Sequence, residues 1–242
     1  MKTQRRVLLL VGSPGPQSTS LSLGSHLTGL LGQHGMETET LHITSCLRSP
    51  GAEETLLAAA GRADILILAS PLYVDSLPGP VVAALRILAQ QQGARRAGTR
   101  RRLLAIVNCG FPESHHNDTA LAQVRLFCRD TGIEWSGGLG LGGGGMIAGR
   151  PLAQKGRAVR NVLASLALAA CALAEDEPLP EHAVSLMARP LTPAWLYILV
   201  GHLGWLLQAR RFGVLGRIND RPYSAASGGG RVALDGSEDI EE

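Results

Sequence analysis

Short apolar runs alternate with helix-patterned segments along the first 175 residues, and this alternation allows few folds. The runs that predict strands are residues 7–11, 37–42, 65–69, 103–107 and 133–136. Between them, apolar residues recur at spacings of three and four, as on one face of a helix. Strands that alternate with helices form a parallel sheet with helices on both faces. The sequence therefore predicts an α/β fold with a doubly wound five-stranded parallel sheet.

Three parts are expected along the chain. Residues 1–175 are predicted to form the sheet domain, with the flavodoxin-like strand order 2-1-3-4-5. Residues 176–223 are predicted to be a C-terminal helical extension. Residues 224–242, which contain SGGG and an acidic end, are predicted to be disordered.

The extension is expected to contain a helix at residues 193–210 and an extended segment at 217–223. The apolar residues of this helix form one broad stripe, and Arg210 and Arg211 follow it where positive charge suits the helix dipole. We expect the stripe to pack against its own subunit or a partner subunit. Attachment to a membrane surface is the alternative, which the thin basic face of the helix disfavours.

Composition narrows the class of protein. The net charge is only +3 and the basic residues form no single stripe, so no nucleic-acid partner is expected. The four cysteines are far apart and no CxxC is present, which indicates reduced thiols in a cytoplasmic protein rather than disulfides or a zinc site. The apolar run at 7–11 is too short for a signal peptide.

Ligands of an open parallel sheet bind beyond the carboxyl ends of its strands. Four loops leave the predicted strands at that end, at residues 12–20, 70–79, 108–118 and 139–150. The arginine-rich segment 93–102 enters the fourth strand from the opposite end and is interpreted as a solvated loop. The site is therefore expected among the four loops.

The first of these loops, GSPGPQSTS, is rich in hydroxyl groups and leads into a helix. Free backbone N–H groups and the helix dipole favour an anion at such a helix start. The loop has neither the GK[ST] of a P-loop nor a GxGxxG fingerprint. It could bind one terminal phosphate, or its hydroxyls could be ordinary helix caps.

The second loop, ASPLYVDSLPGP, holds one of only three tyrosines in the chain. Pro71 keeps the preceding residue extended, so the peptide groups of residues 72–74 are directed across the site. Tyr73 could then lie along a planar ligand. The alternative is a surface turn in which Tyr73 covers apolar residues.

These motifs resemble those of NAD(P)H-dependent FMN reductases and flavodoxin-family oxidoreductases. The resemblance rests on GSPGPQSTS, ADILILASPLYVDSLPGPV, VNCGFPE and IEWSGGLGLGGGGMI, and it spans roughly residues 6–175. It implies a flavodoxin-like fold, non-covalent FMN, a homodimer, and hydride transfer from NAD(P)H as co-substrate.

The resemblance also implies which residues hold the cofactor. The residues implied for the phosphate are Ser13, Ser18, Thr19 and Ser20; those flanking the isoalloxazine are Pro71, Leu72, Tyr73 and Val74; those lining its other edge are Asn108, Cys109, Gly110 and Phe111. Two departures stand out. Gly15 replaces a basic residue that many members carry, which removes one possible phosphate charge. Cys46 stands alone where many members have clustered cysteines, which argues against iron–sulfur or multi-thiol subtypes.

The ExHHxD segment leaves three interpretations open. Glu113, His115, His116 and Asp118 could bind a metal, form a pocket wall, or belong to a solvated loop. Adjacent histidines in an extended loop would point in opposite directions, so no metal site is predicted. Cys109 has no base spaced to activate it and is expected to be a packed thiol.

The predicted function is an FMN-dependent oxidoreductase that transfers hydride from NAD(P)H through FMN to a small acceptor such as a quinone or free flavin. No catalytic side chain is predicted, because the cofactor carries the redox chemistry. An electron carrier like flavodoxin is one alternative. The other is a non-catalytic FMN-binding protein whose C-terminal helix docks a partner or membrane.

Overall fold

The computed structural model describes residues 4–48, 51–90 and 100–221. The predicted acidic tail and residues 93–99 of the arginine-rich segment lie outside these ranges. The described chain groups into two compact units, Met1–Tyr197 and Ile198–Glu242.

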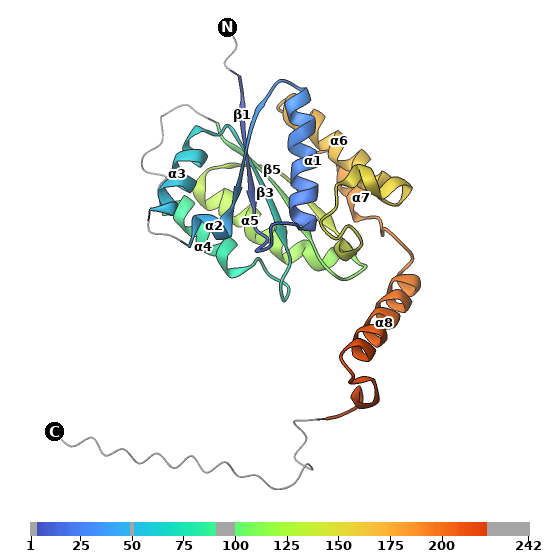
Figure 1. The fold of residues 1–242 in the computed structure, drawn as a ribbon. Coiled ribbons are helices and arrows are strands. Elements are labelled where there is room, and N and C mark those ends of the chain that lie inside the picture. Colours follow the sequence, from blue (N-terminus) through green and yellow to red (C-terminus); the bar gives the residue numbers. More distant parts are fainter. Residues whose placement is uncertain (1–3, 49–50, 91–99, 222–242) are drawn as a thin grey trace, which may run out of the picture. The chain divides into compact units, whose positions relative to one another are not determined.

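The first unit is built on one five-stranded parallel sheet of order β2-β1-β3-β4-β5 (Figure 1). Its strands are β1 (Arg6–Val11), β2 (Glu37–His42), β3 (Ile65–Pro71), β4 (Arg102–Asn108) and β5 (Glu134–Leu141). The central strands β1, β3 and β4 are buried along nearly their whole length, as strands covered on both faces should be. The predicted flavodoxin-like fold and strand order are confirmed.

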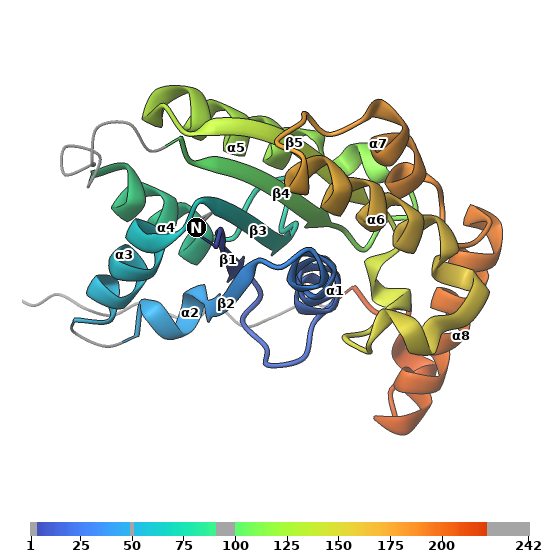
Figure 2. The ribbon, with the colours of Figure 1, turned by 90° about the horizontal axis from the view of Figure 1, so that it is seen from above.

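Helices cover both faces of the sheet (Figure 2). On one face, α1 (Thr19–Gln33), α6 (Arg160–Ala174) and α7 (Glu181–Ala188) share a core with alternate strand residues such as Leu9 and Ile67. On the other face, α2 (Ile43–Cys46), α3 (Ala52–Arg62), α4 (Gly79–Gln90) and α5 (Asp118–Thr131) pack on the intervening residues, such as Leu8 and Leu66. Successive side chains of each strand point to opposite faces of the sheet and therefore pack into two separate cores.

Helix α6 is a core helix. Together with the preceding 3-10 segment it forms the one stretch in the described part of the chain, Leu152–Ala174, that is long and apolar enough to cross a membrane. Its Val162, Leu166 and Leu173 are buried against the sheet, which accounts for its apolar character without a membrane.

Helix α7 packs as part of the sheet domain, although it lies in the segment predicted as an extension. Ala183, Leu186 and Met187 are buried, and the Ser165 hydroxyl of α6 donates a hydrogen bond of 2.7 Å to the Ala183 carbonyl. The three-part division of the chain at residues 175 and 223 stays a prediction.

Arg102, at the start of β4, corrects the interpretation of residues 93–102 as a solvated loop. Its side chain is only 5% exposed and lies 3.7 Å from Glu134 and 3.4 Å from Asp176. It also donates to the Glu177 carbonyl at 2.5 Å. The guanidinium joins β4 and β5 to the chain after α6, because a buried cation needs carboxylate and carbonyl partners. The sequence of a basic run does not show which of its arginines is buried beside carboxylate and carbonyl groups.

The last elements are α8 (Ala194–Arg211) and the 3-10 turn η5 (Leu215–Arg217). No side chain of α8 is buried. The prediction of an extended segment at 217–223 is wrong in its described part, because Arg217 ends η5 and pairs with Asp220 at 2.8 Å. That the apolar stripe of α8 packs against its own subunit or a partner subunit stays a prediction.

Candidate functional site

A cavity of about 340 Å³ opens at the carboxyl ends of β1, β3 and β4, beside the point where the strand order reverses. Ten of the twelve predicted site residues line it, and Val74 and Phe111 do not. The ten are Ser13, Ser18, Thr19, Ser20, Pro71, Leu72, Tyr73, Asn108, Cys109 and Gly110. Further lining residues are Pro14, Gly15, Gln17, Gly144 and Gly145. All four predicted loops therefore meet here, the fourth through Gly144 and Gly145 after β5.

The hydroxyl groups of the first loop are bonded to one another and to the helix. The Ser13 hydroxyl donates to Ser18 Oγ at 2.6 Å, and Ser18 Oγ accepts the N–H of Leu21 at 3.1 Å, which caps α1. The Thr19 hydroxyl donates to the Gly144 carbonyl at 2.7 Å. Because a hydroxyl has only one proton, Thr19 braces the first loop against the last loop and has no side-chain donor left for a ligand.

Ser20 belongs to a buried network centred on Asn108. The Asn108 Nδ2 donates to Ser20 Oγ at 2.8 Å and to the Ser70 carbonyl at 3.1 Å. Gly144 completes the network from outside, because a Cβ at this position would lie 2.7 Å from Asn108 Oδ1. Asn108 thus ties β4 to α1 and β3, and it requires a residue without a side chain at position 144.

The donors that remain suit a phosphate. The N–H groups of Thr19 and Ser20 begin the 15-residue helix α1, where no preceding turn supplies an acceptor. Ser18 keeps its own hydroxyl proton, since its oxygen only accepts in the two bonds above. No lysine or arginine lines the cavity within the described residues. The donor set fits the phosphate of FMN, held by hydrogen bonds and the helix dipole without a cationic side chain.

The loop after β3 is a tight hairpin. The N–H of Tyr73 donates to the Ser76 carbonyl at 3.0 Å, and the N–H of Ser76 returns to the Tyr73 carbonyl at 3.2 Å. Val74 and Asp75 between them have φ of 48° and 57°, the signs of a type I′ turn. This turn leaves Val74 98% exposed and outside the cavity, whereas Tyr73 lines the cavity and is half exposed.

A positive φ is strained for a β-branched residue. Val74 adopts it without a hydrogen bond from its side chain, at the tip of a loop beside the cavity. Backbone strain of this kind is concentrated at ligand-binding loops. No sequence pattern predicts this strain, because Val74-Asp75 lacks the Asn-Gly or Gly-Gly signature of this turn.

Cys109 is a packed thiol. It is buried, and its Sγ donates weak hydrogen bonds to the carbonyls of Phe111 at 3.4 Å and Glu113 at 3.5 Å. Burial raises the pKa of the Cys109 thiol, so it is neutral near pH 7. These contacts agree with the expected packing role and leave no thiolate to act as a nucleophile.

The two histidines after Phe111 differ from expectation. Residues Ser114–Asn117 form a 3-10 turn, η2, rather than an extended loop. His115 and His116 therefore stack with ring centroids 4.5 Å apart, and Phe111 lies 4.4 Å from His116. The argument that the two rings point in opposite directions is wrong for this reason.

Asn117 is of a residue type that often caps helices. It occupies the N-cap position of α5, but its side chain makes no capping bond. Its Nδ2 donates instead to the carbonyls of Ser114 at 2.9 Å and Leu141 at 3.2 Å. Asn117 is completely buried, and these bonds join the third loop to β5.

Tyr197 is a residue beside the site that the sequence did not indicate. Its hydroxyl donates to the Gly110 carbonyl at 2.7 Å, and its ring passes 3.6 Å from where a Cβ of Gly143 would stand. Burial raises the pKa of the Tyr197 phenol, which stays a donor at neutral pH. In the sequence Tyr197 lies on the helix expected at residues 193–210 but outside its apolar stripe, and no pattern linked it to the site.

Residues 5–129, more than half of the chain, match the family model described as NADPH-dependent FMN reductase. No curated protein sequence matches the chain.

Solved structures are similar in fold. An NAD(P)H:quinone oxidoreductase from Methanothermobacter marburgensis is 17% identical with a TM-score of 0.53, covering 71% of this chain and 100% of its own. RosB with bound 8-demethyl-8-formylriboflavin-5'-phosphate is 16% identical with a TM-score of 0.55, covering 98% and 100%. An FMN-dependent NADH-azoreductase from Bacillus anthracis in complex with FMN is 12% identical with a TM-score of 0.51, covering 71% and 100%.

At these identities the structures show a shared fold, while the family match extends over the first loop, the hairpin loop and the loop after β4. That match agrees with a cavity whose donors suit a phosphate and whose walls carry no charged group. The chain belongs to the NADPH-dependent FMN reductase family and is an NAD(P)H-dependent flavin oxidoreductase with FMN as its cofactor.

Proposed function

We propose that this enzyme passes electrons from NAD(P)H to a small planar acceptor of the quinone class. The observation that carries the proposal is the character of the cavity wall. Among its described lining residues there is no Asp, Glu, His, Lys or Arg, and the half-exposed aromatic ring of Tyr73 stands at its edge. Away from the start of α1, such a wall favours stacking of a flat molecule.

The phosphate of FMN is proposed to lie at the start of α1. Ser18 would donate through its hydroxyl, and Thr19 and Ser20 through their backbone N–H groups. Ser13 would hold the Ser18 hydroxyl in place, since the two oxygens are 2.6 Å apart. The Thr19 hydroxyl serves the scaffold, because its one proton is donated to the Gly144 carbonyl. The Ser20 hydroxyl accepts from Asn108 and keeps its own proton.

The isoalloxazine is proposed to lie between the hairpin loop and the loop after β4. Pro71, Leu72 and Tyr73 would contact it from the first loop, and Asn108, Cys109 and Gly110 from the second, mainly through backbone groups.

The two predicted residues outside the cavity would support this site from behind. Val74 forms the turn that positions Tyr73, and the Phe111 carbonyl accepts the N–H of Gly143 at 2.6 Å.

Bound FMN supplies the redox chemistry, accepting hydride from NAD(P)H and reducing the acceptor. The chain orients the two substrates in turn and excludes water from the buried part of the cavity. No lining side chain is needed as an acid or base, because the reduced acceptor can take its protons from water at the open edge.

Steady-state oxidation of NADPH and NADH with menadione, free FMN or a sulfonated azo dye as acceptor tests the proposal. We expect NAD(P)H to bleach the yellow protein, and menadione to restore its colour fastest. A protein that NAD(P)H bleaches and only free FMN reoxidises would overturn the quinone assignment while leaving the family assignment intact.

Assembly as a homodimer and a cytoplasmic location are proposed on the resemblance to the family and on the reduced thiols. Size-exclusion chromatography with light scattering measures the assembly directly. A monomer at micromolar concentration would contradict the first proposal.

A further inference from the structure

Helix α8 carries many large apolar side chains that are exposed. None of its 18 residues is buried, and Trp195 and Trp205 are 68% and 79% exposed. The other exposed large apolar residues of the helix are Ile198, Leu199, Val200, Leu203, Leu206 and Leu207. So many exposed apolar side chains on one element mark an interaction surface.

The apolar sector of α8 is unusually wide. At about 100° per residue, its large apolar side chains extend over roughly 220° of the circumference, whereas the stripe of a helix packed on a protein core covers roughly 100°. The remaining sector contains Gly201, Gly204 and Gln208. One protein surface covers only one face of a helix, whereas a helix that sinks roughly 5–10 Å into the boundary between headgroups and acyl chains can bury more than half of its circumference.

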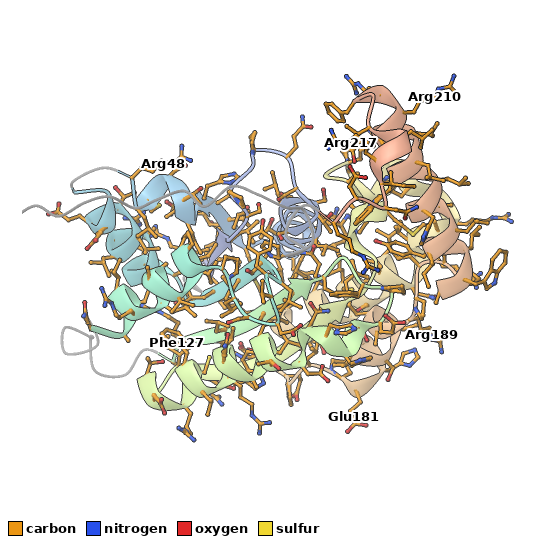
Figure 3. All side chains as sticks on the ribbon, turned by 90° about the horizontal axis from the view of Figure 1, so that it is seen from below. Arg48, Phe127, Glu181, Arg189, Arg210 and Arg217 are labelled. Carbon is orange, nitrogen blue, oxygen red and sulfur yellow. The ribbon has the colours of Figure 1, made fainter. Side chains whose placement is uncertain are left out.

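The charges around this helix have one sign. Residues 182–219 contain four arginines and no aspartate or glutamate. Within the described residues, only one of these arginines has a carboxylate partner, Arg217, which pairs with Asp220 at 2.8 Å. Figure 3 shows the Arg210 side chain extending from the C-terminal end of α8, with its guanidinium away from other side chains. Arg189 and Arg210 therefore bracket an uncharged segment of 20 residues, 190–209.

We propose that α8 binds the surface of a membrane rich in anionic lipids. Its leucines and tryptophans would enter the boundary between headgroups and acyl chains, where the amphipathic rings of tryptophan are favoured. Arg210 and Arg211 would reach the lipid phosphates along their aliphatic stems. This proposal differs from the expectation that a subunit surface covers the stripe. It rests on the width of the apolar sector and on arginines at the two ends of the uncharged segment, not on a basic face along the helix.

The helix is placed on the membrane rather than across it. Its 18 residues span about 27 Å, less than the roughly 30 Å of a hydrocarbon core, and they include His202 and Gln208. Attachment in the interface plane is favoured by tryptophan side chains at the headgroup level and by cations that reach the lipid phosphates. Attachment of this kind is reversible and depends on lipid charge.

Flotation of the FMN-loaded full chain with vesicles tests the proposal. One set of vesicles contains phosphatidylcholine alone, and the other equal parts of phosphatidylcholine and phosphatidylglycerol. We expect flotation with the second set, weakened by salt because it depends on charge. Arg210→Gln/Arg211→Gln should lower affinity for the anionic vesicles roughly 30-fold, and Leu203→Ser/Trp205→Ser should abolish flotation.

Val82→Ser/Leu126→Ser is the matched control, because both side chains are about half exposed on the sheet domain. It should float like the unmodified protein, and the flavin absorbance of every variant should be unchanged. The proposal is overturned if the unmodified protein does not float with anionic vesicles at low salt. It is also overturned if Leu203→Ser/Trp205→Ser floats normally, or converts a dimer to a monomer without affecting flotation, since the helix would then bind a second copy.

Discussion

Asn108 at the end of β4 donates a hydrogen bond of 2.8 Å to Ser20 in the first turn of α1, and both side chains are buried. The same amide donates to the Ser70 carbonyl at the end of β3. One side chain thus fixes the relative positions of the three elements whose loops form the cavity. The floor of the cavity therefore contains a buried polar network centred on Asn108.

Replacing Asn108 with alanine should lower the free energy of unfolding by about 1–3 kcal/mol, because the Ser70 carbonyl and the Ser20 hydroxyl lose a buried partner. Urea unfolding measures the loss, and FMN affinity should fall with it. Asn161→Ala is the matched control, since Asn161 is only partly buried on α6. Equal stability of the two variants would show that the network does not brace the site.

Ser13→Ala combined with Ser18→Gly should weaken FMN binding by at least 10-fold, because hydrogen bonds to a charged group are worth about 1.5–3 kcal/mol each. Glycine is chosen at position 18 because it costs only a few tenths of a kcal/mol as an N-cap. Fluorescence titration of the apoprotein with FMN gives the affinity. Ser22→Ala, which removes a hydroxyl bonded to the Ser18 carbonyl at 3.0 Å, should bind FMN normally. Unchanged affinity of the double variant would reject the phosphate assignment.

Tyr73→Ala should change the absorbance of bound FMN and the rate of menadione reduction, with little effect on thermal stability. The side chain is half exposed and lies at the cavity edge, so little packing is lost. Absorbance spectra and thermal melts of the loaded protein separate the two effects. A large loss of stability with an unchanged spectrum would instead identify Tyr73 as a packing residue.

Val74→Asn should raise the free energy of unfolding by about 1 kcal/mol, because asparagine tolerates the left-handed backbone that costs other residues roughly 1–2 kcal/mol. The φ of 48° at Val74 requires that conformation. Val82→Asn, at a half-exposed position on the helix α4 with helical backbone, should be neutral or destabilising. If both substitutions have the same effect on urea unfolding, the turn is not strained.

Burial raises the pKa of Cys128 on α5 to about 12. Above about pH 9 the thiol ionises in the unfolded chain but stays protonated in the folded protein, so stability should fall as pH rises, by at most ~1.4 kcal/mol per pH unit. Cys128→Ala should flatten this slope in urea unfolding between about pH 8 and 10.5. Cys171→Ala, at an exposed thiol, should keep it, and identical slopes for all three proteins would contradict the assignment.

Local pattern alone determined the sheet and its main helices. Three features are each specified by residues adjacent in the chain. They are the five strand segments, the helix start in GSPGPQSTS, and Pro80 in the first turn of α4. The strand order was expected because five strands that alternate with helices suit the flavodoxin-like order. Ten of twelve predicted site residues reached one cavity for the same reason, since parallel strands bring their carboxyl ends together.

The tertiary structure alone decided the partners of side chains that are distant in sequence. Sequence pattern separates apolar from polar residues, but it cannot tell which polar group is buried, because burial depends on the elements that pack over it. Arg102 looked like one cation of a solvated run until the chain after α6 supplied Asp176 and the Glu177 carbonyl. Asn117 looked like a helix cap until β5 supplied the Leu141 carbonyl, and Thr19 looked like a phosphate donor until the last loop supplied the Gly144 carbonyl.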